Sequence, residues 1–143
     1  MDIKRFGNRQ GKTIMLLHGN LMCWRQFENL IPLLEKKFCV YAVSFDGFDG
    51  TGETTYTTAQ AQADKLAEYI EKELDGRLDL LYAGSLGCGP AIFLKASPNI
   101  QIGRMILSGP EYLDFGVLNR LILKVMPQKQ YRTAHEKYMP AWA

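Results

Sequence analysis

The sequence lacks the features of several classes of protein. Its net charge is only +2, and its Lys and Arg residues form no basic stripe for nucleic-acid phosphates. No apolar run reaches the roughly 18–20 residues that a membrane helix needs. The first residues, Met1 to Arg5, are not followed by an apolar segment with a cleavage site. We therefore expect no nucleic-acid partner, no membrane span and no export signal.

Cysteine and histidine are also scarce. The three cysteines, Cys23, Cys39 and Cys88, have unrelated spacings, and no Cys-x-x-Cys or Cys/His pattern predicts a metal site. We expect reduced thiols in a cytoplasmic protein that needs no metal and no cofactor. The only histidines are His18 and His135, which restricts the groups available for acid–base chemistry.

What the sequence does contain is an alternation of short apolar runs and helical patterns. Its 143 residues suggest one domain, and 47% of them are hydrophobic, as in an ordinary globular protein. Apolar runs bounded by glycine predict strands that are buried on both faces. The predicted strands are Thr13–Leu17, Phe38–Val43, Leu78–Tyr82 and a run centred on Met105–Leu107, and the helical segments are Trp24–Leu34, Thr58–Leu74 and Pro90–Ala96.

This order predicts an α/β fold with a doubly wound, mainly parallel sheet of four or five strands. Ile3–Phe6 could add an antiparallel edge strand. Thr57 with Gln60 predicts a capping box at the start of the second helix, and Asp75-Gly76 predicts its end.

The end of the chain has a different pattern. Val117 to Val125 is an amphipathic helix pattern, and no further strand follows it. We expect a core over residues 1–116 and C-terminal helices over residues 117–143. The strand around Ile106 then becomes an apolar sheet edge. We expect this edge to pair with another copy of the chain, giving a homo-oligomer, or to be covered by the C-terminal helices.

The third predicted strand leads into Ala83-Gly84-Ser85-Leu86-Gly87, and a helix follows. A sharp turn between strand and helix forces strained dihedrals on the serine and needs small residues two positions to either side. Such a turn lifts the hydroxyl of Ser85 above the carboxyl edge of the sheet, where the N–H of Leu86 can donate to an oxyanion. The alternative is a glycine-rich helix entry in which Ser85 is only an N-cap.

The first parallel strand ends in His18-Gly19-Asn20. A tight turn here can direct the N–H of Asn20 toward the same point as the N–H of Leu86, and two such donors form an oxyanion hole. The alternative is a plain strand-to-helix turn. For His18 itself we expect a structural role, in which its side chain bonds the backbone.

These two motifs and the glycine-rich loop Asp46–Thr54 resemble the N-terminal part of the α/β-hydrolase superfamily, from about Lys12 to about Asp114. The resemblance implies a serine nucleophile at Ser85 that attacks a carboxylic ester or related small-molecule acyl substrate. It also implies a cap that begins in the C-terminal helices.

The sequence departs from that family in one serious respect. The family takes its acid and its histidine from later strands, and this sequence stops before them. A triad built from His135 with Glu111 or Asp114 would need an unusual fold-back. Three hypotheses therefore stay open: a serine hydrolase, an incomplete hydrolase-like module that binds a ligand or partner, and a fragment that is active only in an assembly.

Overall fold

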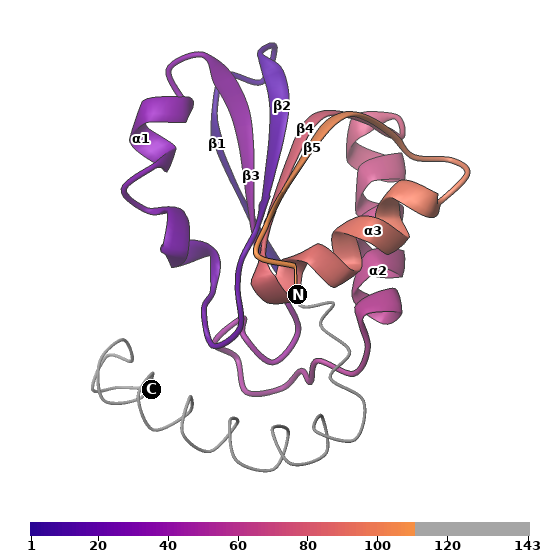
Figure 1. The fold of residues 1–143 in the computed structure, drawn as a ribbon. Helices are drawn as coiled ribbons and strands as arrows, with labels where there is room; N and C mark the ends of the chain where they lie inside the picture. The colour runs from indigo at the N-terminus through magenta and orange to yellow at the C-terminus, as the bar shows by residue number, and fades with distance from the viewer. Residues whose placement is uncertain (111–143) are drawn as a thin grey trace. The chain divides into compact units, whose positions relative to one another are not determined.

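The computed structural model describes residues 1–110, and every structural statement below concerns these residues. They form a five-stranded sheet with the order β1-β3-β2-β4-β5 (Figure 1). β1 is antiparallel to β3, whereas all other neighbours are parallel. This confirms the predicted fold class and the antiparallel edge strand. The strands are β1 Asp2–Gly7, β2 Lys12–Leu17, β3 Phe38–Ser44, β4 Arg77–Gly84 and β5 Gln101–Ser108.

Helices cover both faces of the sheet (Figure 1). α2 and α3 lie on one face, and α1 with the short 3₁₀ helix η1 lies on the other. Along β2, Met15 and Leu17 pack in the core under α2 and α3, while Ile14 and Leu16 pack in the core under α1. All four side chains are buried, as the continuous apolar run predicts for a central parallel strand. The helices are η1 Trp24–Phe27, α1 Ile31–Leu34, α2 Ala59–Leu74, η2 Ser85–Gly87 and α3 Cys88–Ala96.

The predicted single helix Trp24–Leu34 is wrong, because the structure has two short pieces there, η1 and α1. Proline explains the break. A continuous helix would need the N–H of Pro32 to donate to the carbonyl of Glu28, and proline has no N–H. Pro32 instead lies in the first turn of α1, where that donor is not required.

The predicted helix α2 is confirmed, but its N-cap is one residue later than expected. The hydroxyl of Thr58, not Thr57, accepts a hydrogen bond from the N–H of Ala61 at 3.1 Å. At the other end Asp75 adopts the left-handed conformation with φ 50°, and Gly76 donates to Ile70. The predicted end at Asp75-Gly76 is therefore confirmed.

β5 is an edge strand of the described sheet, and the side chain of Ile106 is 50% exposed. The predicted C-terminal helices, the boundary at residues 116 and 117, and the residues Glu111, Asp114 and His135 lie outside the described residues. None of the helices within residues 1–110 is both long and apolar enough to cross a membrane.

Candidate active site

Ser85 lies in the sharp turn that the sequence predicts. β4 ends at Gly84 in extended backbone, with φ −108° and ψ 133°, and Ser85 then has φ 44°. A positive φ is rare for a residue that carries a side chain, and such strain is concentrated at functional sites. The side chain of Ser85 is half-buried, and α3 begins three residues further on. The N–H of Leu86 belongs to the same turn.

Gly87 shows why this turn needs small residues. A Cβ atom at this position would lie 2.9 Å from the carbonyl oxygen of His18 and 2.9 Å from the Cβ of Leu17. Real side chains do not approach backbone so closely, so only glycine fits without a shift. The other small residue, Ala83, is fully buried in the core under α2 and α3. This close packing sets the Ser85 turn directly against the end of β2.

The structure brings the turn after β2 and the Ser85 turn together. β2 and β4 are neighbouring parallel strands, with Leu17 opposite Ala83. Their carboxyl ends therefore meet at one edge of the sheet. A Cβ atom at Gly19 would lie only 3.7 Å from the Cβ of Ser85. The predicted site residues Asn20, Ser85 and Leu86 thus belong to two adjacent turns.

His18 is fully buried and bonded at both ring nitrogens. Its Nε2 accepts from the N–H of Phe45 at 3.0 Å, so the ring proton is on Nδ1, which donates to the carbonyl of Gly19 at 2.7 Å. Burial lowers the pKa of His18 to about 4, although the bond to Gly19 acts in the opposite direction. A neutral ring with both nitrogens occupied has no lone pair left for a serine proton. These contacts agree with the structural role predicted for His18.

The carbonyl of Gly19 receives two hydrogen bonds, from His18 and from the N–H of Met22 at 3.3 Å. The C=O and N–H of a trans peptide point in opposite directions. These bonds therefore also fix the direction of the N–H of Asn20. Leu21 completes the turn with φ 58°, and its N–H bonds the side chain of Asn20 at 3.0 Å. No sequence pattern indicated this conformation, because leucine has no preference for it.

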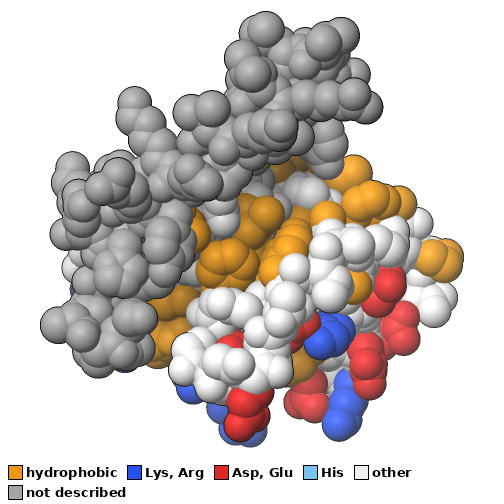
Figure 2. Space-filling model, turned by 90° about the horizontal axis from the view of Figure 1, so that it is seen from below, with side chains coloured by type: hydrophobic (Ala, Val, Ile, Leu, Met, Phe, Trp, Pro, Cys, Tyr) orange, Lys and Arg blue, Asp and Glu red, His pale blue; other side chains and the backbone are white. Residues whose placement is uncertain are grey.

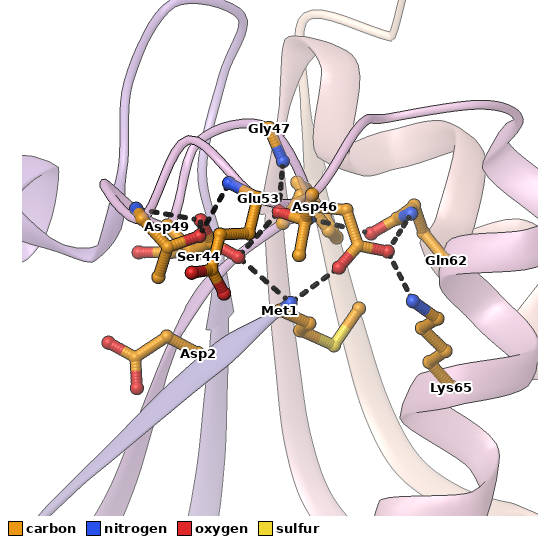
Figure 3. Close-up of polar contacts among 12 residues, drawn as sticks. Met1, Asp2, Ser44, Asp46, Gly47, Asp49, Glu53, Gln62 and Lys65 are labelled. Carbon is orange, nitrogen blue, oxygen red and sulfur yellow. Dashed lines mark hydrogen bonds and ion pairs between the residues drawn. The ribbon is translucent and has the colours of Figure 1, made fainter.

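A charged cluster holds the loop after β3 (Figure 3). Asp46 accepts hydrogen bonds from the α-ammonium group of Met1, from Lys65 at 2.6 Å and from Gln62 at 2.9 Å. Burial alone would raise the pKa of Asp46, but the bonds from Lys65, Met1 and Gln62 lower it to about 2. Asp46 is therefore a carboxylate at neutral pH, and its oxygens are bonded to Met1, Lys65 and Gln62.

Asp49 organises the rest of this loop. It accepts from the hydroxyl of Thr54 at 2.6 Å, from Thr51 and from Met1 at 3.1 Å. The hydrogen bond from Thr54 lowers the pKa of Asp49. Burial acts in the opposite direction, and the bonds from Thr51 lower the pKa further. Sequence reasoning missed this cluster because it joins the first residue to positions more than 40 residues away. Within residues 1–110 no group of three or more His, Cys, Asp or Glu side chains could hold a metal ion.

Aromatic side chains extend from His18 across this edge of the sheet. The ring centroid of His18 lies 5.3 Å from that of Phe48, and Phe48 lies 6.1 Å from Tyr56. Phe48, Tyr56 and Leu86 are all only partly buried. Figure 2, which views the molecule from the carboxyl ends of the parallel strands, shows hydrophobic side chains gathered on this face. The edge of the sheet that carries the serine turn therefore also carries partly exposed apolar side chains.

A mainly parallel sheet with a strained serine at the end of strand β4, beside the His-Gly turn that follows β2, is the architecture of an α/β hydrolase. The chain belongs to that family, because the model of the alpha/beta hydrolase family matches residues 14–143.

Solved structures agree with this assignment. The chain is similar to an α/β-hydrolase family protein from Desulfitobacterium hafniense, with a TM-score of 0.85, 20% identity, and coverage of 98% of this chain and 56% of that one. It is also similar to an α/β hydrolase from Sphaerobacter thermophilus, with a TM-score of 0.69, 20% identity, and coverage of 98% and 58%.

A third similar structure is 1H-3-hydroxy-4-oxoquinoline 2,4-dioxygenase, with a TM-score of 0.71, 20% identity, and coverage of 97% of this chain and 56% of that one. At such identities the likeness shows the fold alone. That neighbour is called a dioxygenase, so the fold by itself does not determine the reaction. The chain spans little more than half the length of each of these proteins.

Proposed function

We propose that this chain is the nucleophile-bearing part of a serine hydrolase that cleaves carboxylic esters or related small-molecule acyl substrates. The observation that carries the proposal is the φ of 44° at Ser85, directly beside the Gly19 turn. The hydroxyl of Ser85 attacks the substrate carbonyl, and the N–H groups of Leu86 and Asn20 stabilise the oxyanion. Loss of one such donor raises the barrier by about 3 kcal/mol.

The attacking serine must lose its proton to a base. His18 is the one histidine among residues 1–110, and both of its ring nitrogens are occupied. The base therefore comes from beyond the described residues: His135 with Glu111 or Asp114, a histidine further along a longer polypeptide, or a histidine of another polypeptide. His135→Gln separates these sources, because it stops the reaction of the isolated chain only if His135 is the base.

A fluorophosphonate probe tests the proposal, because it reacts covalently with activated serines. We expect labelling of the full chain, complete loss of labelling in Ser85→Ala, and unchanged labelling in Ser97→Ala. Ser97 is a matched control. It lies just beyond the end of α3, and its hydroxyl donates to the backbone carbonyl of Phe93. A wild-type chain that stays unlabelled at micromolar concentration contradicts the proposal.

A second candidate function is a binding module that retains the site without its chemistry. The bonded state of His18 favours it, since the described part of the chain offers Ser85 no free imidazole. This candidate predicts that a non-hydrolysable acyl analogue binds the chain and that the fluorophosphonate does not label it. Labelling that is lost in Ser85→Ala excludes it.

We also propose that the chain associates through the outer edge of β5, with another copy or with the residues that follow it. An edge strand presents unpaired backbone N–H and C=O groups that can pair with another strand, and the half-exposed Ile106 adds apolar surface beside them. Sedimentation should detect a dimer at micromolar concentration that Ile106→Lys dissociates. A monomer whose residues after 116 are readily cleaved by protease contradicts both forms of the proposal. We further propose a cytoplasmic location, in which thiols such as those of Cys23 and Cys39 stay reduced.

A further inference from the structure

We infer that Gln26 is a positioning residue for the oxyanion turn, an inference that rests on the proposed serine hydrolysis. Gln26 lies in η1, and its side chain is exposed to solvent. Its Oε1 accepts a hydrogen bond from the N–H of Gly19 at 2.9 Å. This bond joins residues seven positions apart and fixes the orientation of the Gly19 amide. Because Gln26 is exposed, its side chain contributes little to the hydrophobic core.

The side-chain amide of Gln26 lies between the two turns of the site. A Cβ atom at Gly19 would be 3.8 Å from its Oε1 and 3.7 Å from the Cβ of Ser85. A Cβ atom at Gly84 would be 3.9 Å from its Nε2. The Gln26 amide therefore lies at ordinary van der Waals distance from these two positions, close to both turns.

Gly19 is held on both sides. Its N–H is bonded by Gln26, while its carbonyl is bonded by His18 and by the N–H of Met22. Glycine otherwise has the greatest backbone freedom of all residues. Rotation about Gly19 would turn the next peptide group, and with it the N–H of Asn20. Gln26 therefore acts through Gly19 on the proposed oxyanion donor, and does not touch the reacting atoms itself.

The neighbouring strain makes such an anchor useful. Leu21 is held at φ 58°, a conformation that costs free energy for any residue with a side chain. Without an anchor on the Gly19 N–H, the turn can relax toward other conformations that release this strain. The Asn20 N–H would then point toward the oxyanion for only part of the time.

Three variants of the full chain test the inference. Gln26→Met has nearly the same shape but no acceptor oxygen, whereas Gln26→Glu keeps an acceptor at the same chain length. Asn29→Met places the same new side chain at an exposed position just beyond η1. The measurements are the fluorophosphonate labelling rate as a function of probe concentration, and hydrogen exchange at the amides of Gly19 and Asn20.

We expect Gln26→Met to lower the maximal labelling rate of Ser85 about tenfold, with an unchanged half-saturating probe concentration, because oxyanion donors act mainly in the transition state. Exchange at the Gly19 amide should accelerate in the same variant. Gln26→Glu should restore the slow exchange and label at least threefold faster than Gln26→Met, since solvent screens its charge. Asn29→Met should match the wild type in both measurements.

Wild-type labelling kinetics in Gln26→Met overturn the inference, and so does a change confined to the half-saturating concentration. An equal loss in Gln26→Glu and Gln26→Met, with slow Gly19 exchange in the former, also overturns it. If the wild-type chain is never labelled, the proposed hydrolysis fails and the catalytic role of Gln26 fails with it. Gly19 exchange then shows separately whether the Gln26 bond exists in solution.

Discussion

The turns around Ser85 and the loop after β3 lie at the same edge of the sheet, but different forces hold them. Close glycine packing and neutral hydrogen bonds fix the first, as at Gly87 and His18. Ionic bonds fix the second, between Asp46, Lys65 and the α-ammonium group of Met1. The comparison shows that the proposed reactive centre depends on shape and the surrounding loop on charge. Salt and mutation should therefore affect the two regions separately.

A lower pH should give the largest change in the free energy of unfolding, through His18 beside the turns around Ser85. Its pKa is about 4 when folded, against about 6.5 when unfolded, so the unfolded chain binds the proton first. The stabilisation is complete above pH 6.5 and is lost as the pH falls toward 4, by about 3 kcal/mol in total. Urea unfolding at several pH values measures it.

His18→Leu serves as the control for this pH dependence. The variant should be less stable at pH 7, because Phe45 and Gly19 lose their partner. It should also show a much flatter curve between pH 6.5 and 4. Asp46, with a pKa of about 2 when folded, loses its contribution only below about pH 4. An equally steep curve in His18→Leu would assign the effect to other groups.

An intermediate effect is expected from Gly87→Ala. The new methyl group would lie 2.9 Å from the carbonyl of His18, which is backbone and cannot move aside easily. We expect a loss of about 2 kcal/mol in the free energy of unfolding, together with slower labelling of Ser85 as the two turns separate. Gly50→Ala is the control for the labelling. Gly50 has a φ of 79°, whereas Gly87 has a φ of −63°, so alanine at position 50 strains the backbone, but nothing lies within 4 Å of the new atom and labelling of Ser85 should not change.

The smallest effect is expected in the charged region, from Lys65→Met. The side chain of Lys65 is about half exposed, so its bond to Asp46 should contribute less than about 1 kcal/mol. This loss should shrink further in 0.5 M salt, because ions screen the pair. Labelling of Ser85 should not change. A salt-independent loss, or slower labelling, would show that the two regions are coupled.

Local patterns in the sequence predicted most of the fold. Strand runs such as Thr13–Leu17 were recognisable because a strand buried on both faces must be apolar throughout. The end of α2 at Asp75-Gly76 was recognisable because helices often end at residues in the left-handed conformation. Glycine adopts this conformation easily, and Asp75 and Gly76 both have it here. The errors at Trp24–Leu34 and Thr57 were also local: Pro32 interrupts the helix, and the cap lies one residue later.

The candidate site was predictable where it depends on residue size. Ala83, Gly84 and Gly87 leave room for a sharp turn, so the position of Ser85 followed from the sequence. The bonds of Gln26, Leu21 and Met1 did not follow, because each depends on where the chain returns in space. No composition or periodicity encodes such a partner.

The sequence alone determined which residues can lie close together: apolar runs that pair as buried strands, and small residues that let two turns meet beside Ser85. Only the tertiary structure decided the state of the polar groups there. His18 is neutral because the fold buries it, and its Nε2 accepts from Phe45, 27 positions away; Gly19 is anchored because Gln26 reaches it from another element. The physical reason is that burial depends on local side-chain chemistry, whereas a hydrogen bond needs two groups that only folding brings together.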